Sequence, residues 1–392
     1  MIEPAAPRVQ YDHFQLMRGV ACLMVLLNHV AGYLSIPLKP PADAWFSPML
    51  VPLGFPWVWL FLILSGFLLT KVFVTKRFAL DANGIKAFYV RRARRLIPLI
   101  WAVLLLWSVL YVLRIWSSHL PQLDIARELG IALAFPWVPY FQSTQAIASV
   151  NSPIWSAVIE IHYCVLMPLV LLATGLSLRG LIALLALWAA AMAVLAATVI
   201  LTGQPDIFPI VYGGHLYNAG FFIAGMALAL CPSRDAVRLV PWSAVIALVC
   251  VAVVGTQYAA YHDLNLTLAI LPLVLLPVWC LLVARADDRY QSKLPSALRQ
   301  IWGGTNPLRW LELVGMMSYS VYLAHKPLSY ILIDRLNLGS LVSGYASFVL
   351  VSVLCFLLLL PVFAALNIFV EVRFRRPWRS AFPLTVRRPG GA

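Results

Sequence analysis

Long apolar stretches alternate with polar segments along the whole chain. A membrane-spanning α-helix needs about 20 mainly apolar residues to cross a hydrocarbon layer of about 30 Å. Stretches of about that length occur at residues 16–36, 52–74, 96–116, 153–175, 180–202, 216–233, 241–261, 264–285, 312–334 and 342–370. The pattern predicts an all-α integral membrane protein, built as a bundle of about ten transmembrane helices. An even number of spans places both termini on the same side.

Composition supports this class. Of the 392 residues, 62% are hydrophobic and 11% are charged, whereas about a quarter of a soluble domain is charged. The net charge is +14, but the basic residues are unevenly placed. With the N-terminus inside, 24 of the 29 Lys and Arg residues lie at the inner side, and the exceptions are Lys39, Arg114, Arg127, Lys326 and Arg335. The positive-inside rule therefore predicts that both termini are cytoplasmic, and it explains the basic excess without a nucleic-acid partner.

No segment between the spans is long enough to form a separate soluble domain. We expect residues 1–376 to form one transmembrane domain and residues 377–392 to form a basic cytoplasmic tail. The first span lacks a small-residue cleavage site, so it is expected to be retained rather than removed as a signal peptide. The longest outer segment, 117–152, contains an apolar stretch interrupted by prolines, which predicts an interfacial or re-entrant piece. The six cysteines are expected to pack among apolar side chains rather than form disulfides or a metal site.

His29, Glu160 and His325 are ionisable residues well inside predicted spans, where such groups are costly and usually functional. At a rise of about 1.5 Å per residue, His29 lies about 16 Å beyond Arg18, which stands at the cytoplasmic end of the first span. Glu160 lies about 11 Å from the outer face and His325 about 20 Å from the inner face, so the three share one layer slightly outward of the midplane. A carboxylate and imidazoles at one level can form a general base with an orienting partner. The spacing leaves open whether they touch, and a histidine can also simply bridge two helices.

Arginines gather at the start of the predicted third span. The group consists of Arg91, Arg92, Arg94 and Arg95. One explanation of such a row is that it simply holds that end of the span in the cytoplasm. Arginine rather than lysine also favours phosphate recognition, because the guanidinium group binds phosphate oxygens in a bidentate way. Arg18 lies at the same face of the membrane, so the arginines can form one site for an anionic ligand.

Aromatic side chains and glycines accompany the ionisable residues. Trp155 stands near the outer end of the fourth span, where an ordinary aromatic-belt residue is also expected. Tyr319 and Tyr322 lie in the ninth span, and Tyr212 stands before two glycines at the outer mouth of the sixth, which can simply make a turn. The Ser-Gly pair at 65–66 in the second span is suited to the close approach of another helix.

The ordered set of motifs resembles the acyltransferase-3 family, membrane O-acyltransferases that modify carbohydrates and related acceptors. The family's first-helix pattern of Arg or Lys, ten residues and His is similar to Arg18–His29. The other similar segments are Phe61–Phe67, Arg91–Pro98, Trp155–Cys164, Ser318–His325 and Glu371–Phe374. The chain departs from the family pattern at Gln15, Cys164 and Ala324, where an acidic residue, Tyr and Trp are usual. In having Gln at position 15, the chain is similar to the exopolysaccharide-modifying members of the family.

The resemblance implies transfer of an acyl group, often acetyl from acetyl-CoA, to a sugar hydroxyl outside the cytoplasm. The acceptor that it implies is an exopolysaccharide, a lipopolysaccharide or a lipid-linked oligosaccharide, and the implied location is the bacterial inner membrane. Acyl-CoA is then a donor substrate rather than a permanently bound cofactor, and no metal is expected.

A mechanism consistent with both the residues and the resemblance begins on the cytoplasmic side. Arg18 and the arginines at 91–95 hold the phosphates of acyl-CoA, and the pantetheine arm carries the thioester to the layer of His29. His29 acts as a general base on the acceptor hydroxyl or takes the acyl group itself. Glu160 orients His29 or stabilises its imidazolium form.

The remaining candidates belong to the path of the substrates. His325, Tyr319 and Tyr322 are expected to line the path of the thioester or to donate hydrogen bonds to the developing oxyanion. The acceptor is expected to enter from the outer side, near Trp155 and Tyr212.

Two other functions also account for a buried layer of Glu and His. A proton-coupled transporter places such residues at mid-membrane and predicts flux that depends on a proton gradient, with no covalent product. A non-catalytic sensor or flippase subunit that binds a lipid-linked sugar predicts that His29 can be replaced without loss of a chemical product.

Overall fold

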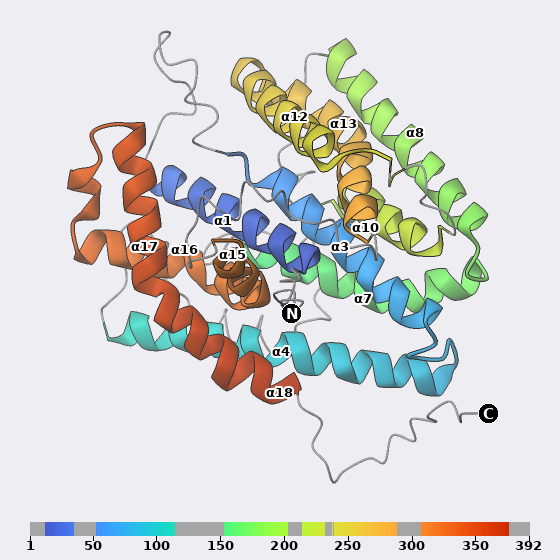
Figure 1. The fold of residues 1–392 in the computed structure, drawn as a ribbon, viewed down its shortest axis with the longest axis horizontal. Coiled ribbons are helices and arrows are strands. Elements are labelled where there is room, and N and C mark those ends of the chain that lie inside the picture. The colour runs from blue at the N-terminus through green and yellow to red at the C-terminus, as the bar shows by residue number, and fades with distance from the viewer. Residues whose placement is uncertain are drawn as a thin grey trace, which may run out of the picture.

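The computed structural model describes residues 12–34, 52–113, 153–202, 214–231, 237, 239–287 and 307–375. Helices make up nearly all of this part of the chain, and it contains no strand. Eight of its helices are long and apolar enough to cross a membrane. The described chain is therefore an all-helical bundle of the kind that membrane proteins form, with its helices packed side by side (Figure 1).

Most helices follow the predicted apolar stretches. The longer ones are α1 (His13–Tyr33), α3 (Phe55–Val74), α4 (Ala82–Val112), α7 (Ile154–Ala173), α8 (Leu178–Thr202), α12 (Trp242–His262), α13 (Leu264–Ala286) and α17 (Tyr345–Ala365). The shorter ones are α10 (His215–Leu230), α15 (Pro307–Met316) and α16 (Ser318–Arg335). After α17 the helix continues as a π-helical segment, Leu366–Val372, into α18 (Arg373–Arg375).

Two of the ten predicted spans do not form long apolar helices. The predicted sixth span is α10, which has 16 residues. The predicted ninth span, 312–334, divides at Met317 into α15 and α16. α16 carries His325, Lys326 and Asp334, and most of it is buried by other helices rather than turned toward lipid. The expected count of about ten spans is therefore not reproduced in the described residues.

α3 lies in the middle of the bundle (Figure 1), and 15 of its 20 residues are buried. Glycines bring it close to α10. A Cβ atom at Gly66 would lie 2.1 Å from the carbonyl oxygen of Phe222, and one at Gly225 would lie 2.1 Å from that of Ile63. Only glycine allows two backbones to approach so closely. The close helix approach predicted for Gly66 is confirmed.

α1 and α16 run side by side in the same direction. Cys22 Sγ lies 3.6 Å from the carbonyl oxygen of Ser318, and His29 Nδ1 lies 2.9 Å from Nε2 of His325. Both pairs are separated by 296 residues in the sequence. The equal separations show that the two helices keep one register over about two turns.

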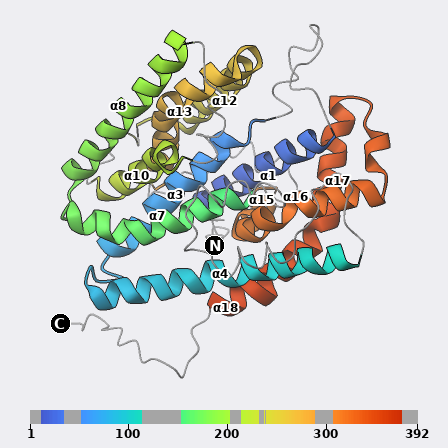
Figure 2. The ribbon, with the colours of Figure 1, turned by 180° about the vertical axis from the view of Figure 1, so that it is seen from behind.

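α4 begins at Ala82, 14 residues before the predicted third span. The Asp81 carboxylate accepts a hydrogen bond of 2.7 Å from the Gly84 amide and so caps the first turn. The arginines at 91–95 therefore lie within a continuous helix and project at fixed helical angles. Seen from behind, α4 runs along one edge of the bundle, below α7 and α16 (Figure 2).

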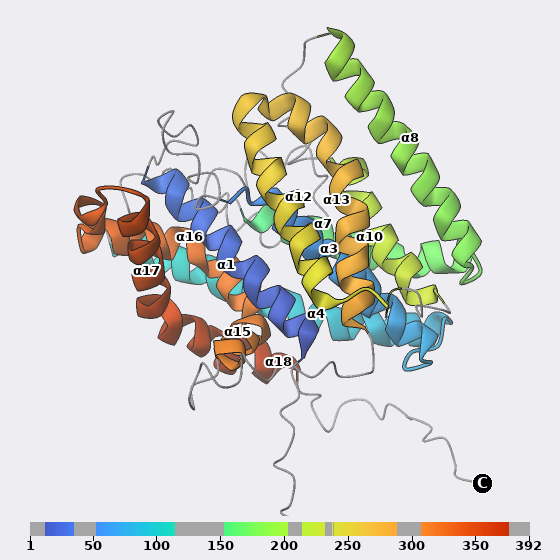
Figure 3. The same cartoon turned by 45° about the horizontal axis from the view of Figure 1, so that its top comes forward.

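The peripheral helices expose apolar side chains. α8 lies at the outer edge of the bundle (Figure 3), and Leu187 and Val194 on it are 69% and 67% exposed. Val251 of α12 and Leu350 of α17 are exposed to 70% and 67%. Apolar surface of this extent fits contact with lipid tails rather than with water.

Candidate functional site

A cavity of about 340 Å³ lies between α3 and α4. The two helices supply Ser65, Leu68, Leu69 and Val72 from α3, and Phe88, Arg91, Arg92 and Arg95 from α4. In each helix the positions follow an i, i+3, i+4, i+7 spacing, which is the pattern of a single helix face. The remaining lining residues are Arg18, Arg77, Phe78 and Glu160.

Positive charge dominates this cavity. Five of its twelve lining residues are arginines and one is acidic. Guanidinium groups bind phosphate and carboxylate oxygens in a planar, bidentate way, and partial burial strengthens the interaction. We therefore call this space the arginine cavity. Its chemistry suits a ligand with several negative charges.

Glu160 is held by the arginine cavity. Its Oε1 accepts hydrogen bonds from Arg92 Nη2 at 2.8 Å and from Ser65 Oγ at 2.9 Å. The side chains of Arg92 and Glu160 are only 12% and 22% exposed, so water screens this ion pair weakly. Arg92 Nη2 also lies 3.6 Å from Cys164 Sγ. This carboxylate thus fixes one of the five arginines that line the cavity.

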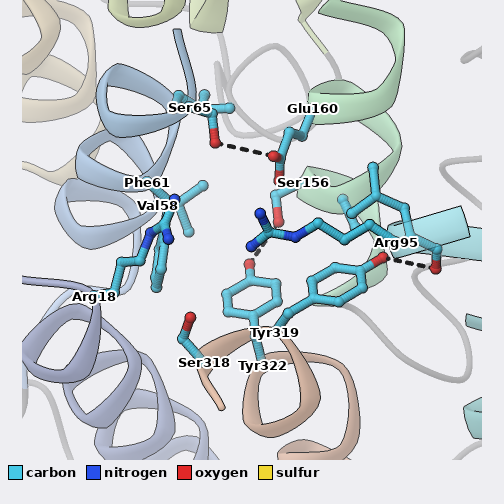
Figure 4. A pocket seen from close by; sticks show the side chains of 13 residues that line it. Arg18, Val58, Phe61, Ser65, Arg95, Ser156, Glu160, Ser318, Tyr319 and Tyr322 are labelled. Atoms are coloured by element: carbon cyan, nitrogen blue, oxygen red, sulfur yellow. Dashed lines mark hydrogen bonds between the residues drawn. The ribbon is translucent and has the colours of Figure 1, made fainter. Parts of the chain in front are cut away.

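A smaller cavity of about 60 Å³ adjoins the first and shares four lining residues with it. The shared residues are Arg18, Ser65, Arg95 and Glu160. Figure 4 shows Arg18 from α1 and Arg95 from α4 reaching into this space, with Tyr319 and Tyr322 of α16 closing one side. We call it the narrow cavity.

Hydroxyl groups line the narrow cavity. The hydroxyls of Ser156 and Tyr322 lie 2.6 Å apart, and the Tyr319 hydroxyl donates to the carbonyl oxygen of Leu96 at 3.2 Å. Ser318 adds a further hydroxyl. Together with the guanidinium groups of Arg18 and Arg95, these hydroxyls give the small space a polar lining.

Two histidines form a hydrogen-bonded pair between α1 and α16. His325 is only 1% exposed, and its Nδ1 lies 2.9 Å from the carbonyl oxygen of Tyr322 and 3.1 Å from that of Val321. Nδ1 of His325 must therefore carry the hydrogen, which leaves Nε2 as an acceptor in the neutral ring. His29 Nδ1, 2.9 Å from that Nε2 and 3.0 Å from the Val25 carbonyl oxygen, is then the donor. Nε2 of His29 consequently keeps a free lone pair.

The histidine pair lies one helical turn beyond the narrow cavity. Tyr322 belongs to both places, since its side chain lines the cavity and its carbonyl oxygen accepts a hydrogen bond from His325. The rings of Tyr322 and His325 have centroids 6.0 Å apart. Neither histidine lines the two cavities described above. Arginine cavity, narrow cavity and histidine pair thus follow one another through the bundle.

Comparison with known protein families gives a match that covers most of the chain. A family model of the acyltransferase-3 type, described as an acyltransferase domain, matches residues 11–366. The chain belongs to the acyltransferase-3 family. Comparisons with curated proteins and with solved structures returned no match. The resemblance carried by the sequence motifs is confirmed, and the family supports membrane acyltransferase activity for the chain.

Four of the five arginines predicted for the acyltransferase's anion site line the arginine cavity, and Arg94 does not. Arg94 stands one residue before Arg95, which places it about 100° around the helix from the face that lines the cavity. Sequence alone could not choose among the four arginines between 91 and 95, because the choice depends on which face of α4 turns toward α3.

Glu160 does not contact the histidines, contrary to the expectation that it orients His29. Its hydrogen-bond partners in the described chain are Ser65 and Arg92. The partner of His29 is His325. The predicted single layer therefore divides into an acid–arginine group and a histidine pair. Depth along a span does not determine the azimuth of a side chain, so residues at one predicted level need not touch.

The predicted aromatic contacts have mixed outcomes. Tyr319 and Tyr322 of the acyltransferase line the narrow cavity as expected. Trp155 is buried against Phe55, with ring centroids 6.3 Å apart, and lines neither cavity. Tyr212 lies outside the described residues, as does the outer segment 117–152.

Sequence reasoning missed two contributors to the site. Arg77 looks like an ordinary basic residue in a connecting segment, and nothing in its local sequence marks it. Ser156 carried a usable signal, because it stands one turn before Glu160 on α7 and so shares a face with it. Both residues line the cavities of the acyltransferase.

Proposed function

We propose that this membrane acyltransferase transfers an acyl group, acetyl in the first instance, from acyl-CoA to a hydroxyl of an extracytoplasmic or lipid-linked carbohydrate. The observation that carries the proposal is the arginine cavity, with five guanidinium groups against one carboxylate, leading into a hydroxyl-lined narrow cavity. Acyl-CoA has the matching form, with a polyphosphate head and a thin arm that ends in the thioester.

Size supports a short acyl group. The narrow cavity of about 60 Å³ leaves room for a few atoms beside the hydroxyls of Ser156 and Tyr322. Among the described residues, this cavity leaves no room for a long acyl chain. Acetyl is therefore the donor group that we propose first.

The histidine pair supports a general-base step. In the proposed reaction, the free Nε2 of His29 takes the proton of the acceptor hydroxyl while the hydroxyl oxygen bonds to the thioester carbonyl carbon. The carbon–sulfur bond then breaks, and the CoA thiolate leaves and receives the proton held by His29. The same lone pair also permits an acyl-histidine intermediate, formed before the acceptor arrives.

The other groups stabilise charge and position in this scheme. Arg95 lines the narrow cavity and is placed to donate hydrogen bonds to the oxyanion that forms at the thioester carbonyl. Tyr319 and Tyr322 line the path of the thioester. Glu160 keeps Arg92 in position for the donor phosphates through the 2.8 Å ion pair. Its part in the scheme is to orient an arginine rather than His29.

Membrane orientation completes the proposal. The positive-inside bias predicts that the arginine cavity faces the cytoplasm, where acyl-CoA is available. The acceptor then approaches from the opposite side, as an exopolysaccharide, a lipopolysaccharide or a lipid-linked oligosaccharide of a bacterial inner membrane. A proton-coupled transporter gains no support from the family.

The test is acyl transfer by purified protein in nanodiscs. The protein is incubated with [¹⁴C]acetyl-CoA, with and without an extracytoplasmic glycan fraction, and label on the glycan is counted. We expect transfer that depends on both protein and glycan. Absence of label transfer from acetyl-CoA and from longer acyl-CoA donors to every glycan fraction would overturn the proposal.

A further inference from the structure

One end of the arginine cavity is formed by the turn between α3 and α4. The Arg77 amide donates to the Val72 carbonyl oxygen at 2.9 Å, and the Lys76 amide donates to that of Phe73 at 2.9 Å. These two bonds, with Lys76 at a positive φ of 55°, make a Schellman cap at the end of α3. The cap fixes the backbone of Arg77 relative to α3, so its exposed side chain starts from a defined position at the cavity.

Aromatic rings reinforce the same turn. Phe73, Phe78 and Phe88 form a cluster with ring centroids between 5.1 and 6.2 Å apart. Phe88 is buried, while Phe78 is only half-buried and lines the cavity together with Arg77. A ring surface and a guanidinium group therefore meet at this end, the combination that stacks on nucleobases and binds phosphates.

The turn lies far from the reactive end of the site. The face of α3 that lines the two cavities runs from Val58 to Val72, about 21 Å at the rise of an α-helix. Hydroxyl groups line the Val58 end, and Arg77 and Phe78 line the Val72 end. A long ligand that bound here would have its reactive group at one end and an anionic aromatic group at the other.

We propose that Arg77 binds the 3′-phosphate of the donor's nucleotide and that the Phe78 ring contacts its adenine. Within the described residues, no carboxylate lies within salt-bridge distance of Arg77, so its charge is available to a ligand. The turn thereby selects CoA thioesters over acyl donors that lack the nucleotide. This inference rests on the proposed function, because it concerns the same donor.

Binding of CoA and of 3′-dephospho-CoA tests the assignment. Both ligands are titrated onto wild-type protein in nanodiscs and onto the variants Arg77→Ala, Arg77→Lys and Lys86→Ala. A lost charged hydrogen bond of about 1.4 kcal/mol or more corresponds to at least about tenfold weaker binding. We expect Arg77→Ala to weaken CoA by that factor, to leave 3′-dephospho-CoA unchanged, and to be partly rescued in Arg77→Lys. Lys86→Ala, which removes an exposed charge outside the cavity, leaves both ligands unchanged.

The outcomes separate this inference from the proposed function. If Arg77→Ala weakens both ligands equally, or neither, the 3′-phosphate assignment is overturned while acetyl transfer by the wild-type protein still supports the function. If the wild-type protein neither binds CoA nor transfers acetyl from acetyl-CoA, both the function and the inference are overturned.

Discussion

The reactivity of His29 depends on which of its ring nitrogens carries the hydrogen. Two backbone carbonyl oxygens hold the hydrogen of His325 on Nδ1, which leaves Nε2 of His325 as an acceptor. Because His29 Nδ1 lies 2.9 Å from this Nε2, the hydrogen of the neutral His29 ring is on Nδ1. The backbone of α16 thus determines that Nε2 of His29 is the free base. His325 acts in this scheme as a positioning residue, since it touches His29 and lines neither cavity.

Replacement of His325 tests whether it positions the His29 ring in this way. His325→Ala removes the acceptor for His29 Nδ1, so we expect kcat to fall by about 100-fold, within the range of general-base effects, with little change in donor KM. His325→Gln retains an oxygen that can accept from His29 and should recover part of the loss. Steady-state kinetics of well-folded variants measures both. Equal activity of Ala and Gln variants would contradict the positioning role.

Neighbouring arginines on α4 provide a matched comparison for the donor site. Arg95 lines both cavities and Arg94 lines neither, although each carries one charge on the same helical turn. Arg95→Ala should weaken CoA binding by about tenfold or more, the cost of a lost charge-assisted hydrogen bond. Arg94→Ala should leave the affinity nearly unchanged. Equilibrium binding in nanodiscs checks this, and equal weakening by both substitutions would contradict the assignment of the cavity.

Residue chemistry was largely predictable from the sequence, and residue partners were not. The sequence indicated an anion site from Arg18 and the arginines at 91–95, and a buried base from His29 and His325. Partners depend on the azimuth and tilt of helices, which a single sequence does not contain. Glu160 therefore accepts hydrogen bonds from Arg92 and Ser65 and does not contact His29, a pairing that the sequence could not show.

At the scale of elements, the position of α3 determines where the cavities form. Its glycine-containing face packs tightly against α10, while a different face, with Ser65, Leu68 and Val72, borders the arginine cavity. A rigid contact on one side thus keeps the other side at a fixed distance from α4. Loss of that contact is expected to disturb stability before it disturbs chemistry.

A pair of glycine substitutions tests this contact. A Cβ at Gly225 would meet the Ile63 backbone at 2.1 Å, whereas one at Gly255 of α12 meets nothing within 4 Å. Gly225→Ala should lower the free energy of unfolding by about 1–3 kcal/mol through overpacking. Gly255→Ala should be neutral or stabilise by up to about 1 kcal/mol through helix propensity. Thermal unfolding in detergent distinguishes them, and an undiminished Tm for Gly225→Ala would contradict the packing.

Helix existence followed from apolar length, but helix ends and breaks did not. α4 extends to Ala82 because Asp81 caps it, although the added turns are too polar to count as a span. The predicted ninth span breaks at Met317, and its α16 half tolerates His325, Lys326 and Asp334 because its neighbours bury it. Hydropathy alone cannot separate a helix buried in protein from one buried in lipid.

At the scale of the whole molecule, exposed apolar side chains lie at the edge of the bundle and the polar sites lie in its interior. α8, α12 and α17 expose apolar side chains, while the central helices surround the arginine cavity, the narrow cavity and the histidine pair. In the proposed function, a charged donor would bind in this polar interior, away from the apolar side chains at the edge. The sequence predicted the helical membrane class and the family, and the connected order of the three polar sites emerged only from the packing.

The most direct test of this account measures transfer and donor binding in the same sample of the His29→Ala variant. His29 lines neither cavity, so the variant should bind CoA with wild-type affinity. It should transfer no [¹⁴C]acetyl from acetyl-CoA to glycan, because the free Nε2 is gone. Label transfer at the wild-type rate by His29→Ala would contradict the central claim that this lone pair is the base of the acyltransferase.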